Sequence, residues 1–323
     1  MPKAIRIHKT GGPEVMEWEE VEVGQPGEGQ VRLRQTAVAL NYIDTYQRSG
    51  LYPMPLPFSI GNEAAGVVEA VGPGVTNLKA GDRVAYAGLV GAYAEARVAP
   101  ADKMVRIPDG ISDQQAAAMM IKGMTAEYLL FRTYKVQKGD PILIHAAAGG
   151  VGLIVCQWAK HIGATVIGTV GSDEKAKLAS EHGCEHPIVY TRENFVERVK
   201  EITGGKMLPV VYDSVGKDTF MDSLKCLRPR GLMVSFGQSS GKIAPIDTGI
   251  LAAHGSLYLT RPTLFSYAAT RADLEEVSGN LFDVVKRGVV KIEVTQTFPL
   301  RNAAEAHRAL EGRKTTGSVV LTV

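Results

Sequence analysis

The sequence contains few cysteines, and their spacing excludes two common kinds of site. Only three are present among 323 residues, Cys156, Cys184 and Cys226, and no two of them form a C-x-x-C pair. A disulfide framework needs an even set of cysteines, and a structural zinc site needs four nitrogen or sulfur ligands. We therefore expect the three thiols to be reduced and mostly buried.

An excess of one charge and a long hydrophobic segment are also missing. The 36 basic and 34 acidic residues are spread along the chain, so no basic face or tail indicates binding to nucleic acid or to an anionic membrane. The most hydrophobic runs, such as 116–121, are too short to span a bilayer, and no apolar signal segment is present. These features predict a globular protein of the cytoplasm, long enough for two domains.

Two kinds of pattern divide the chain. From about residue 3 to about 120, apolar stretches separated by glycine predict a β-rich, barrel-like domain. The strands expected there are 3–8, 30–41, 64–71, 82–87 and 93–98. From about 139 to 260, strands alternate with helices, which is typical of a parallel sheet with crossover helices. The overall expectation is an α/β protein with a doubly wound sheet.

The expected order of elements in the second part is regular. It reads strand 141–146, helix 150–162, strand 165–169, helix 174–182, strand 187–190, helix 195–202, strand 210–213 and strand 232–236. A helix capped by Ser112 is expected before this part, and helices at 271–287 and 303–312 after it. The last strand, 317–323, is expected to rejoin the N-terminal part, which makes the second part an insertion.

A glycine-rich loop joins the first strand of the alternating part to its helix. Glycine lets the backbone pass close to a pyrophosphate, which the unpaired N–H groups and the dipole of the helix N-terminus attract. Ala147 replaces the usual first glycine of G-x-G-x-x-G, and a plain strand-to-helix turn is the alternative. The residues expected to bind the dinucleotide are Ala148, Gly149, Gly150 and Val151.

The end of the second strand in this part indicates which dinucleotide is bound. NAD sites place a carboxylate there, whereas this chain has Gly171 and Ser172, followed within a turn by Lys175. The first carboxylate, Asp173, comes one step into the next helix. A hydroxyl and a lysine favour the 2′-phosphate of NADPH, with Tyr190 at the same edge. The alternative for Lys175 is an ordinary surface lysine.

Two further strands end in small residues, at 211–216 and 235–239. Small residues let the backbone approach the nicotinamide half of a cofactor, although plain turns have the same composition. Phe236, Gly237 and Ser239 are therefore candidate cofactor contacts.

Six segments carry a resemblance to a known family over nearly the whole chain. They are 11–15, 41–50, 61–66, 79–84, 145–152 and 306–310. The chain resembles the medium-chain dehydrogenase/reductase superfamily and, within it, the zinc-free quinone oxidoreductases related to zeta-crystallin. The resemblance implies a GroES-like catalytic domain at 1–122 and 263–323, a Rossmann NADPH-binding domain inserted at 123–262, and a homodimer.

The resemblance also bears on metal binding. Zinc alcohol dehydrogenases of this superfamily hold their catalytic metal through a cysteine and a histidine, at two places where this chain has Asn41 and Asn62. Amide side chains are poor zinc ligands, so we expect no metal, and no Lewis acid to polarise an alcohol. Asp44 and Glu63 are expected to fix the loops that hold the two asparagines.

Candidate catalytic residues follow from the same resemblance. Tyr46 and Tyr52 are expected to line the acceptor site, Asn41 to orient the nicotinamide ribose or the acceptor oxygen, and Arg261 to lie nearby. Tyr46 and Thr125 also match positions that contact the cofactor in the family. The alternatives are that Tyr52 packs a loop and that Thr125 is buried and bonded to the backbone.

The leading interpretation is an NADPH-dependent reductase of quinones that uses no metal. Reduction of the carbon-carbon double bond of enones or alkenals is a close rival, because it uses the same cofactor geometry and adds a proton donor such as Tyr46 or Tyr52. A third alternative is a structural or RNA-binding protein stabilised by NADPH. No basic or aromatic platform favours that third alternative.

Overall fold

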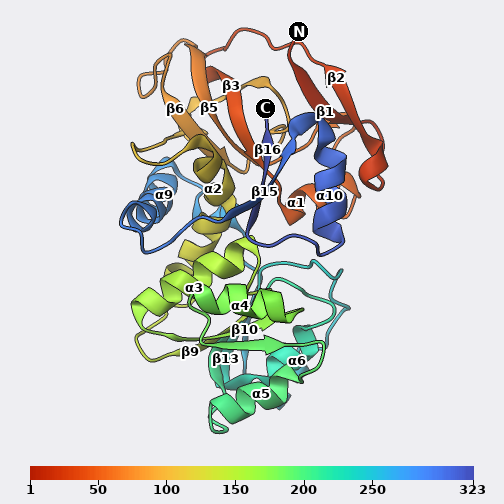
Figure 1. The fold of residues 1–323 in the computed structure, drawn as a ribbon, viewed down its shortest axis with the longest axis vertical. Helices are drawn as coiled ribbons and strands as arrows, with labels where there is room; N and C mark the ends of the chain where they lie inside the picture. Colours follow the sequence, from red (N-terminus) through yellow and green to blue (C-terminus); the bar gives the residue numbers. More distant parts are fainter. The chain divides into compact units, whose positions relative to one another are not determined.

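The computed structural model describes residues 1–323, which form two compact units. Unit 1 collects three segments of the chain, Met1–Met124, Ala268–Lys286 and Ile292–Val323. Unit 2 consists of Thr125–Tyr267 and Arg287–Lys291. The second unit is therefore inserted in the first, as Figure 1 shows by its colours.

Unit 1 is built mainly of β-strands, with helices at its edges (Figure 1). Its strands are β1 (Lys3–Ile7), β2 (Met16–Glu20), β3 (Gln30–Ala39), β4 (Phe58–Ser59), β5 (Glu63–Val71), β6 (Arg83–Ala87), β7 (Ala96–Pro100), β8 (Val105–Arg106), β15 (Val294–Pro299) and β16 (Ser318–Thr322). Its helices are α1 (Tyr42–Arg48), α2 (Asp113–Tyr128), whose last turn belongs to unit 2, α9 (Arg271–Lys286) and α10 (Ala303–Glu311).

The strands of unit 1 form a small and a large sheet. The small sheet has the order β2-β1-β4, and the large one the order β15-β16-β3-β5-β6-β8, with β7 also paired to β3. The C-terminal strand β16 lies antiparallel to β3, from Val320 opposite Ala39 to Thr322 opposite Ala37. The last strand therefore rejoins the N-terminal part of the chain, as the sequence predicts. Buried side chains of β3, including Val31 and Leu33, pack in the core of this unit.

Unit 2 alternates strands with helices. Its strands are β9 (Pro141–His145), β10 (Thr165–Val170), β11 (His186–Val189), β12 (Leu208–Asp213), β13 (Leu227–Ser235) and β14 (Tyr258–Thr260). Its helices are α3 (Gly150–Ile162), α4 (Asp173–Glu181), α5 (Phe195–Ile202), α6 (Phe220–Lys225), α7 (Gly249–Ala253) and α8 (Leu264–Tyr267).

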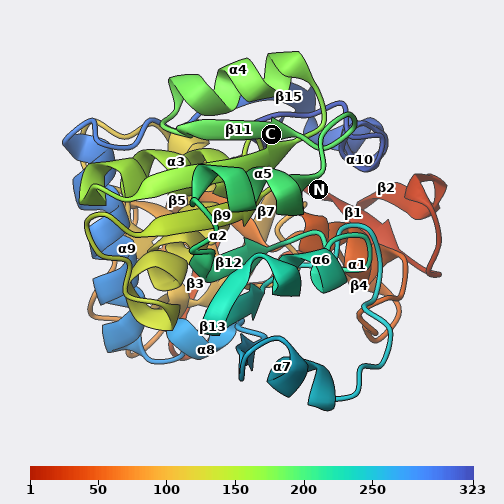
Figure 2. The ribbon, with the colours of Figure 1, turned by 90° about the horizontal axis from the view of Figure 1, so that it is seen from below.

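The sheet of unit 2 has the Rossmann order. The sequence of neighbours is β11-β10-β9-β12-β13-β14, and every pairing is parallel. Figure 2 shows β11, β9, β12 and β13 following one another across this sheet. The order reverses between β9 and β12, and ligands of such sheets bind outside the carboxyl ends of the strands at this point. The predicted α/β fold with an inserted doubly wound sheet is confirmed.

Local sequence signals set several helix ends. Ser112 and Gln115 exchange hydrogen bonds at the start of α2, where Ser112 is the predicted cap. Helix α3 ends at Gly163, whose φ of 91° is left-handed and therefore favours glycine. Helix α5 begins after Asn194, whose side chain accepts hydrogen bonds from two backbone N–H groups.

Two sequence predictions differ from the structure in unit 1. The strand expected at 93–98 lies at Ala96–Pro100, because residues before Ala96 pair with β1 instead of β3: the N–H of Ile5 bonds the carbonyl of Tyr93. The strand expected at 30–41 ends at Ala39, since Asn41 caps the short helix α1. No helix of the structure combines the length and the hydrophobicity needed to cross a membrane.

Candidate functional site

The turn between β9 and α3 has the tight geometry of a dinucleotide-binding loop. A Cβ atom on Gly152 would lie 2.4 Å from the carbonyl oxygen of Ala146, so only glycine lets the helix approach the strand this closely. Ala146 itself has a left-handed φ of 55°. Helix α3 begins after Gly149 without a capping side chain. Its first-turn N–H groups are therefore arranged to attract an anion.

A glycine in β10 compensates for the first glycine of G-x-G-x-x-G, which is Ala147 in this chain. Ala147 is fully buried, and its methyl group lies over Gly168 of β10, where an added Cβ would be only 2.5 Å from it. The sulfur of Cys184 crowds the same position, at 2.7 Å from it. Glycine in β10 thus supplies the space that glycine usually supplies in the loop, and Ala147 does not disturb the turn.

A buried polar network lies at the carboxyl ends of β9, β10 and β12. The imidazole of His145 bonds Thr169 at 2.8 Å and Ser223 at 2.9 Å, and Ser223 donates to Asp213 at 3.1 Å. Burial lowers the pKa of His145, and the charge of Asp213 opposes that shift only in part. The carboxylate of Asp213 also accepts the N–H of Gly216. The network holds the loop that follows β12 in a fixed position.

Four predicted residues come together where β10 and β11 end. Gly171 and Ser172 follow β10, and Tyr190 follows β11 with its N–H bonded to Val170. The hydroxyl of Tyr190 lies 3.0 Å from where a Cβ of Gly171 would be, so a side chain at 171 would displace the tyrosine. Ser172 caps α4 by accepting the N–H of Lys175. These contacts place the predicted 2′-phosphate residues at one edge of the sheet.

The sequence indicated Asp173 at this edge, but not the arginine that binds it, nor the contact between Glu174 and Ser172. Arg192 donates two hydrogen bonds to the carboxylate of Asp173, of 2.8 and 2.5 Å. This arginine holds the pKa of Asp173 below its usual value, and Asp173 raises the pKa of Arg192. A hydrogen bond to Ser172 lowers the pKa of Glu174. The signal for Arg192 in the sequence was its place just after Tyr190.

The loops after β12 and β13 pack against each other. The N–H groups of Phe236 and Gly237 both bond the carbonyl of Asp213, and that of Ser239 bonds Ser214. A Cβ on Gly237 would lie 2.5 Å from the carbonyl oxygen of Ser214, so glycine serves this loop contact. The hydroxyl of Ser235, buried at the end of β13, has no hydrogen-bond partner.

Thr125 and Arg261 both act on one tyrosine of unit 2. Tyr128 is buried and stacked on Tyr267, with ring centroids 4.4 Å apart. Burial raises the pKa of Tyr128, while a hydrogen bond with Thr125 and the charge of Arg261 oppose the rise. The structure therefore brings Thr125 and Arg261 into one neighbourhood.

The remaining predicted residues belong to α1 and the loop after it, in unit 1. Tyr46 and Tyr52 meet edge to face with ring centroids 5.2 Å apart, and the N–H of Tyr52 bonds the carbonyl of Tyr46. Arg48 at the end of α1 is 2% exposed and donates to the carboxylate of Glu311 on α10, which fixes the position of α1. Both tyrosines remain half-buried. They offer aromatic faces and hydroxyl groups together.

The two asparagines at the metal-ligand positions use their amide groups as donors. Asn41 donates to Glu63 at 2.8 Å and, more weakly, to the carbonyl of Ala39 at 3.5 Å. Asn62 donates to Asp44 at 2.6 Å and to the side-chain oxygen of Gln47 at 2.7 Å. The two nitrogens therefore face acceptors of the protein.

Two carboxylates hold this arrangement in place. Asp44 accepts the backbone N–H of Asn41 and the hydroxyl of Tyr93, and burial raises its pKa to about 6 despite the hydrogen bonds that lower it. Glu63 accepts the N–H of Ile121 and the ammonium group of Lys122, at 2.5 and 2.7 Å. Asp44 and Glu63 fix the loops of both asparagines, as the sequence predicts.

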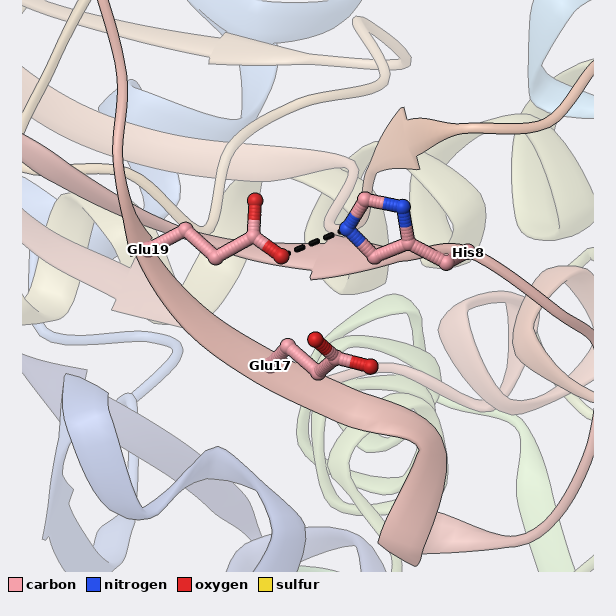
Figure 3. Close-up of side chains that lie close together, drawn as sticks. All are labelled: His8, Glu17 and Glu19. Carbon is pink, nitrogen blue, oxygen red and sulfur yellow. Dashed lines mark hydrogen bonds and ion pairs between the residues drawn. The ribbon is translucent and has the colours of Figure 1, made fainter.

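One group of side chains combines three possible metal ligands, and it lies elsewhere in unit 1. His8, Glu17 and Glu19 bring their ligand atoms within 4.8 Å of one another on β2 and just after β1 (Figure 3). His8 already pairs with Glu19 through its Nε2 atom, and side chains here are solvent-accessible. Exposed acidic groups of this kind are common without a metal.

Two family models match the chain. The alcohol dehydrogenase GroES-like domain matches residues 27–109, and the zinc-binding dehydrogenase model matches residues 150–281. The first match lies in unit 1, and the second covers most of unit 2 and part of α9.

Relatives along the full length are more specific. A quinone oxidoreductase of Pseudomonas aeruginosa is 54% identical and a 2-haloacrylate reductase of a Burkholderia species 52% identical, each alignment covering 99% of both chains. The crystal structure of Escherichia coli quinone oxidoreductase complexed with NADPH has a TM-score of 0.98 and 51% identity, covering 99% of this chain and 100% of that chain. The chain thus belongs to the quinone oxidoreductase family of the medium-chain dehydrogenase/reductase superfamily.

Proposed function

We propose that this protein is an enzyme that transfers reducing equivalents from NADPH to quinones without a metal. The observation that carries the proposal is the dinucleotide site of unit 2, where a tight glycine loop occurs together with a sheet edge that holds Ser172, Lys175 and an arginine-paired carboxylate. Relatives named quinone oxidoreductase support the choice of acceptor. We assign cofactor binding to residues 123–262 and catalysis to residues 1–122 and 263–323.

Unit 2 supplies the groups that bind the cofactor. Ala148, Gly149, Gly150 and Val151 present backbone to the pyrophosphate at the N-terminus of α3. Lys175 and Tyr190 bind the 2′-phosphate next to Gly171. The hydroxyl of Ser172, which is hydrogen-bonded to Glu174, rotates to donate to the phosphate instead. When bound, NADPH supplies a hydride from its nicotinamide ring.

The nicotinamide half is assigned to the ends of β12 and β13 and to the Tyr128 neighbourhood. Phe236, Gly237 and Ser239 border this half, on the loop that packs against the end of β12. Thr125 and Arg261 are assigned to the same half of the cofactor, because Thr125 is hydrogen-bonded to Tyr128 and the charge of Arg261 acts on this tyrosine.

The donor geometry of Asn41 decides between its two suggested roles. Its amide hydrogens point to Glu63 and Ala39, so the one group that it can offer a ligand is the Oδ1 acceptor, which also faces the backbone N–H of Asp44 in the capping box of α1. An acceptor suits a ribose hydroxyl and does not stabilise a developing oxyanion, which needs a donor. We therefore assign Asn41 to the nicotinamide ribose.

Tyr46 and Tyr52 are assigned to the acceptor. Their edge-to-face pair offers an aromatic surface on which a planar quinone stacks, and their hydroxyl groups donate to its oxygen as negative charge develops. Asn41 and Asn62 do not fit a zinc ion, because their nitrogens donate to acceptors of the protein and carry no lone pair for a metal. An electron-poor acceptor needs no Lewis acid, which is why quinones fit this site better than alcohols.

Reduction of an activated carbon-carbon double bond is the second candidate. The 2-haloacrylate reductase that shares 52% of its residues with this chain favours it. This reaction needs a proton at the carbon next to the one that receives the hydride, and the hydroxyl of Tyr46 or Tyr52 is the candidate donor.

Steady-state assays distinguish the two candidates. Purified protein with NADPH is compared on 1,4-benzoquinone, 9,10-phenanthrenequinone, 1-octen-3-one and 2-chloroacrylate. A quinone reductase shows the highest kcat/KM on the quinones, and this is the result we expect. A higher kcat/KM on either alkene substrate would replace the quinone proposal by the double-bond reductase.

Assembly and location are two separate proposals, and each has its own test. We propose a homodimer, as the family resemblance implies, and light scattering coupled to size exclusion measures the mass directly. We propose the cytoplasm as the location, because the three cysteines are buried free thiols, which fit a reducing compartment. Cell fractionation tests this assignment.

A further inference from the structure

The NADPH-type edge of unit 2 contains a carboxylate in a position that should work against NADPH. Asp173 is the first residue of α4 and directly follows Ser172. A carboxylate near the end of the second strand is what NAD sites use to bind ribose hydroxyls, and it repels a 2′-phosphate. Glu174 adds a second negative charge one residue later. Lys175 alone balances only one of these two charges.

Arg192 supplies the missing positive charge from the neighbouring strand. It lies two residues beyond Tyr190, and its N–H bonds the carbonyl of Val189, so the turn after β11 fixes its backbone. Its guanidinium group holds both oxygens of Asp173, at 2.8 and 2.5 Å. With Arg192 in place, two positive charges match two negative ones along this edge.

The surroundings of the pair indicate that it does not serve stability. The side chain of Asp173 is 69% exposed and that of Arg192 is 56% exposed. Exposed ion pairs contribute little to folding because solvent screens them. The two hydrogen bonds to Asp173 use two of the five N–H groups of the guanidinium. The arginine therefore neutralises the carboxylate at the protein surface, where a cofactor phosphate would otherwise meet its charge.

We propose that Arg192 is a specificity-determining residue that masks Asp173 and thereby keeps the site selective for NADPH. The inference rests on the proposed NADPH site. Without the arginine, Asp173 and Glu174 outweigh Lys175, the 2′-phosphate is repelled, and the ribose hydroxyls of NADH gain an acceptor. Arg192 thus acts through Asp173, and its effect disappears when Asp173 is removed.

The test measures cofactor binding directly, through nicotinamide fluorescence, with no quinone present. Four proteins are compared: the wild type, Arg192→Ala, Asp173→Ala and the double variant. We expect Arg192→Ala to raise the Kd for NADPH about tenfold and to leave the Kd for NADH unchanged or lower. We expect the double variant to return to within about threefold of the wild-type Kd for NADPH. Without the carboxylate of Asp173, no charge remains there that Arg192 has to neutralise.

A matched control separates this effect from a general loss of charge. Lys225→Ala removes a positive charge from another exposed ion pair of unit 2, with Asp222 on α6, and is expected to change neither Kd. Thermal unfolding of each variant checks the fold. Equal weakening of both cofactors in Arg192→Ala would overturn the inference, and so would a double variant as weak as Arg192→Ala.

Turnover tells failure of the inference apart from failure of the proposed function. The control Lys225→Ala is expected to keep the wild-type kcat on 1,4-benzoquinone, since Lys225 has no assigned role in binding the cofactor or the acceptor. Absence of quinone turnover in the wild type rejects the proposed function and leaves the binding measurements interpretable. An unchanged ratio of the two Kd values in Arg192→Ala rejects the masking role while turnover persists.

Discussion

The two units use the same ion-pair chemistry in opposite settings. In unit 1, Glu63 and Lys122 meet at 2.7 Å with side chains 0% and 8% exposed. In unit 2, Asp173 and Arg192 meet at 2.5 Å with more than half of each side chain exposed. Removing one partner of a buried pair leaves a charge in a medium of low dielectric constant, whereas solvent screens the exposed partner. The buried pair therefore fixes geometry, and the exposed pair remains available to a ligand.

The largest expected effect comes from breaking the buried pair. Glu63→Ala leaves the ammonium group of Lys122 and the amide of Asn41 without their acceptor. We expect the free energy of unfolding to fall by about 3–5 kcal/mol in urea titrations. Asp173→Ala, the exposed counterpart, is expected to leave the free energy of unfolding close to that of the wild type.

A double variant sharpens the same comparison. Glu63→Gln combined with Lys122→Met removes both charges, and we expect it to recover most of the stability that Glu63→Ala loses. A loss below about 1 kcal/mol in Glu63→Ala would mean that water reaches the buried pair, and the contrast between the units would not hold.

The next effect concerns Asp44 and depends on pH. Burial raises its pKa from 3.8 to about 6, so the folded chain binds a proton more tightly than the unfolded chain. The stability from this proton is complete below pH 4 and is lost as the pH rises through 6. Relative to Asp44→Asn, the wild type should lose about 3 kcal/mol of unfolding free energy between pH 4 and pH 7. Urea titrations of both proteins across this range measure it, and a constant difference would contradict the assigned pKa.

The smallest stability effect tests the compensation in the glycine loop. Gly168→Ala places a methyl group against that of Ala147 and the sulfur of Cys184, and we expect a loss of about 1–3 kcal/mol. Adding Ala147→Gly should recover part of the loss, because it removes one of the two clashes. As a control, Gly279→Ala on α9 meets nothing within 4 Å and should be stabilising by up to about 1 kcal/mol. Failure of Ala147→Gly to help would reject the compensation.

Much of the fold was predictable from the sequence, because residues that favour helix ends separate the elements of unit 2. Helices α3 and α5 have the predicted bounds, since glycine and asparagine mark their starts. The elements of unit 1 were harder to predict, because several of them are too short to show a hydrophobic period. Helix α1 has seven residues and β4 has two, which is too little for hydrophobic periodicity to reveal. Strand β15 alternates half-buried with exposed residues, but one of its half-buried residues is Gln296, so its sequence shows no apolar alternation and the strand was missed.

The candidate site was predictable where neighbours in sequence are neighbours in space. Gly149 and Gly150 lie in one loop, and Ser172 and Lys175 in one helix turn. Arg192 could not be assigned this way, because its contact with Asp173 spans 19 residues and depends on β10 and β11 being adjacent. The paired strands, more than the motif, bring the two charges together.

Cofactor discrimination by Lys175 tests the central claim most directly. The dissociation constants of NADPH and NADH are measured by nicotinamide fluorescence for the wild type and for Lys175→Ala. The account predicts that the Kd for NADPH rises about fivefold or more, because a charge-assisted phosphate contact of about 1–3 kcal/mol is lost, while the Kd for NADH stays within about twofold. Equal weakening of both cofactors, or a wild type that binds NADH as tightly as NADPH, would contradict it.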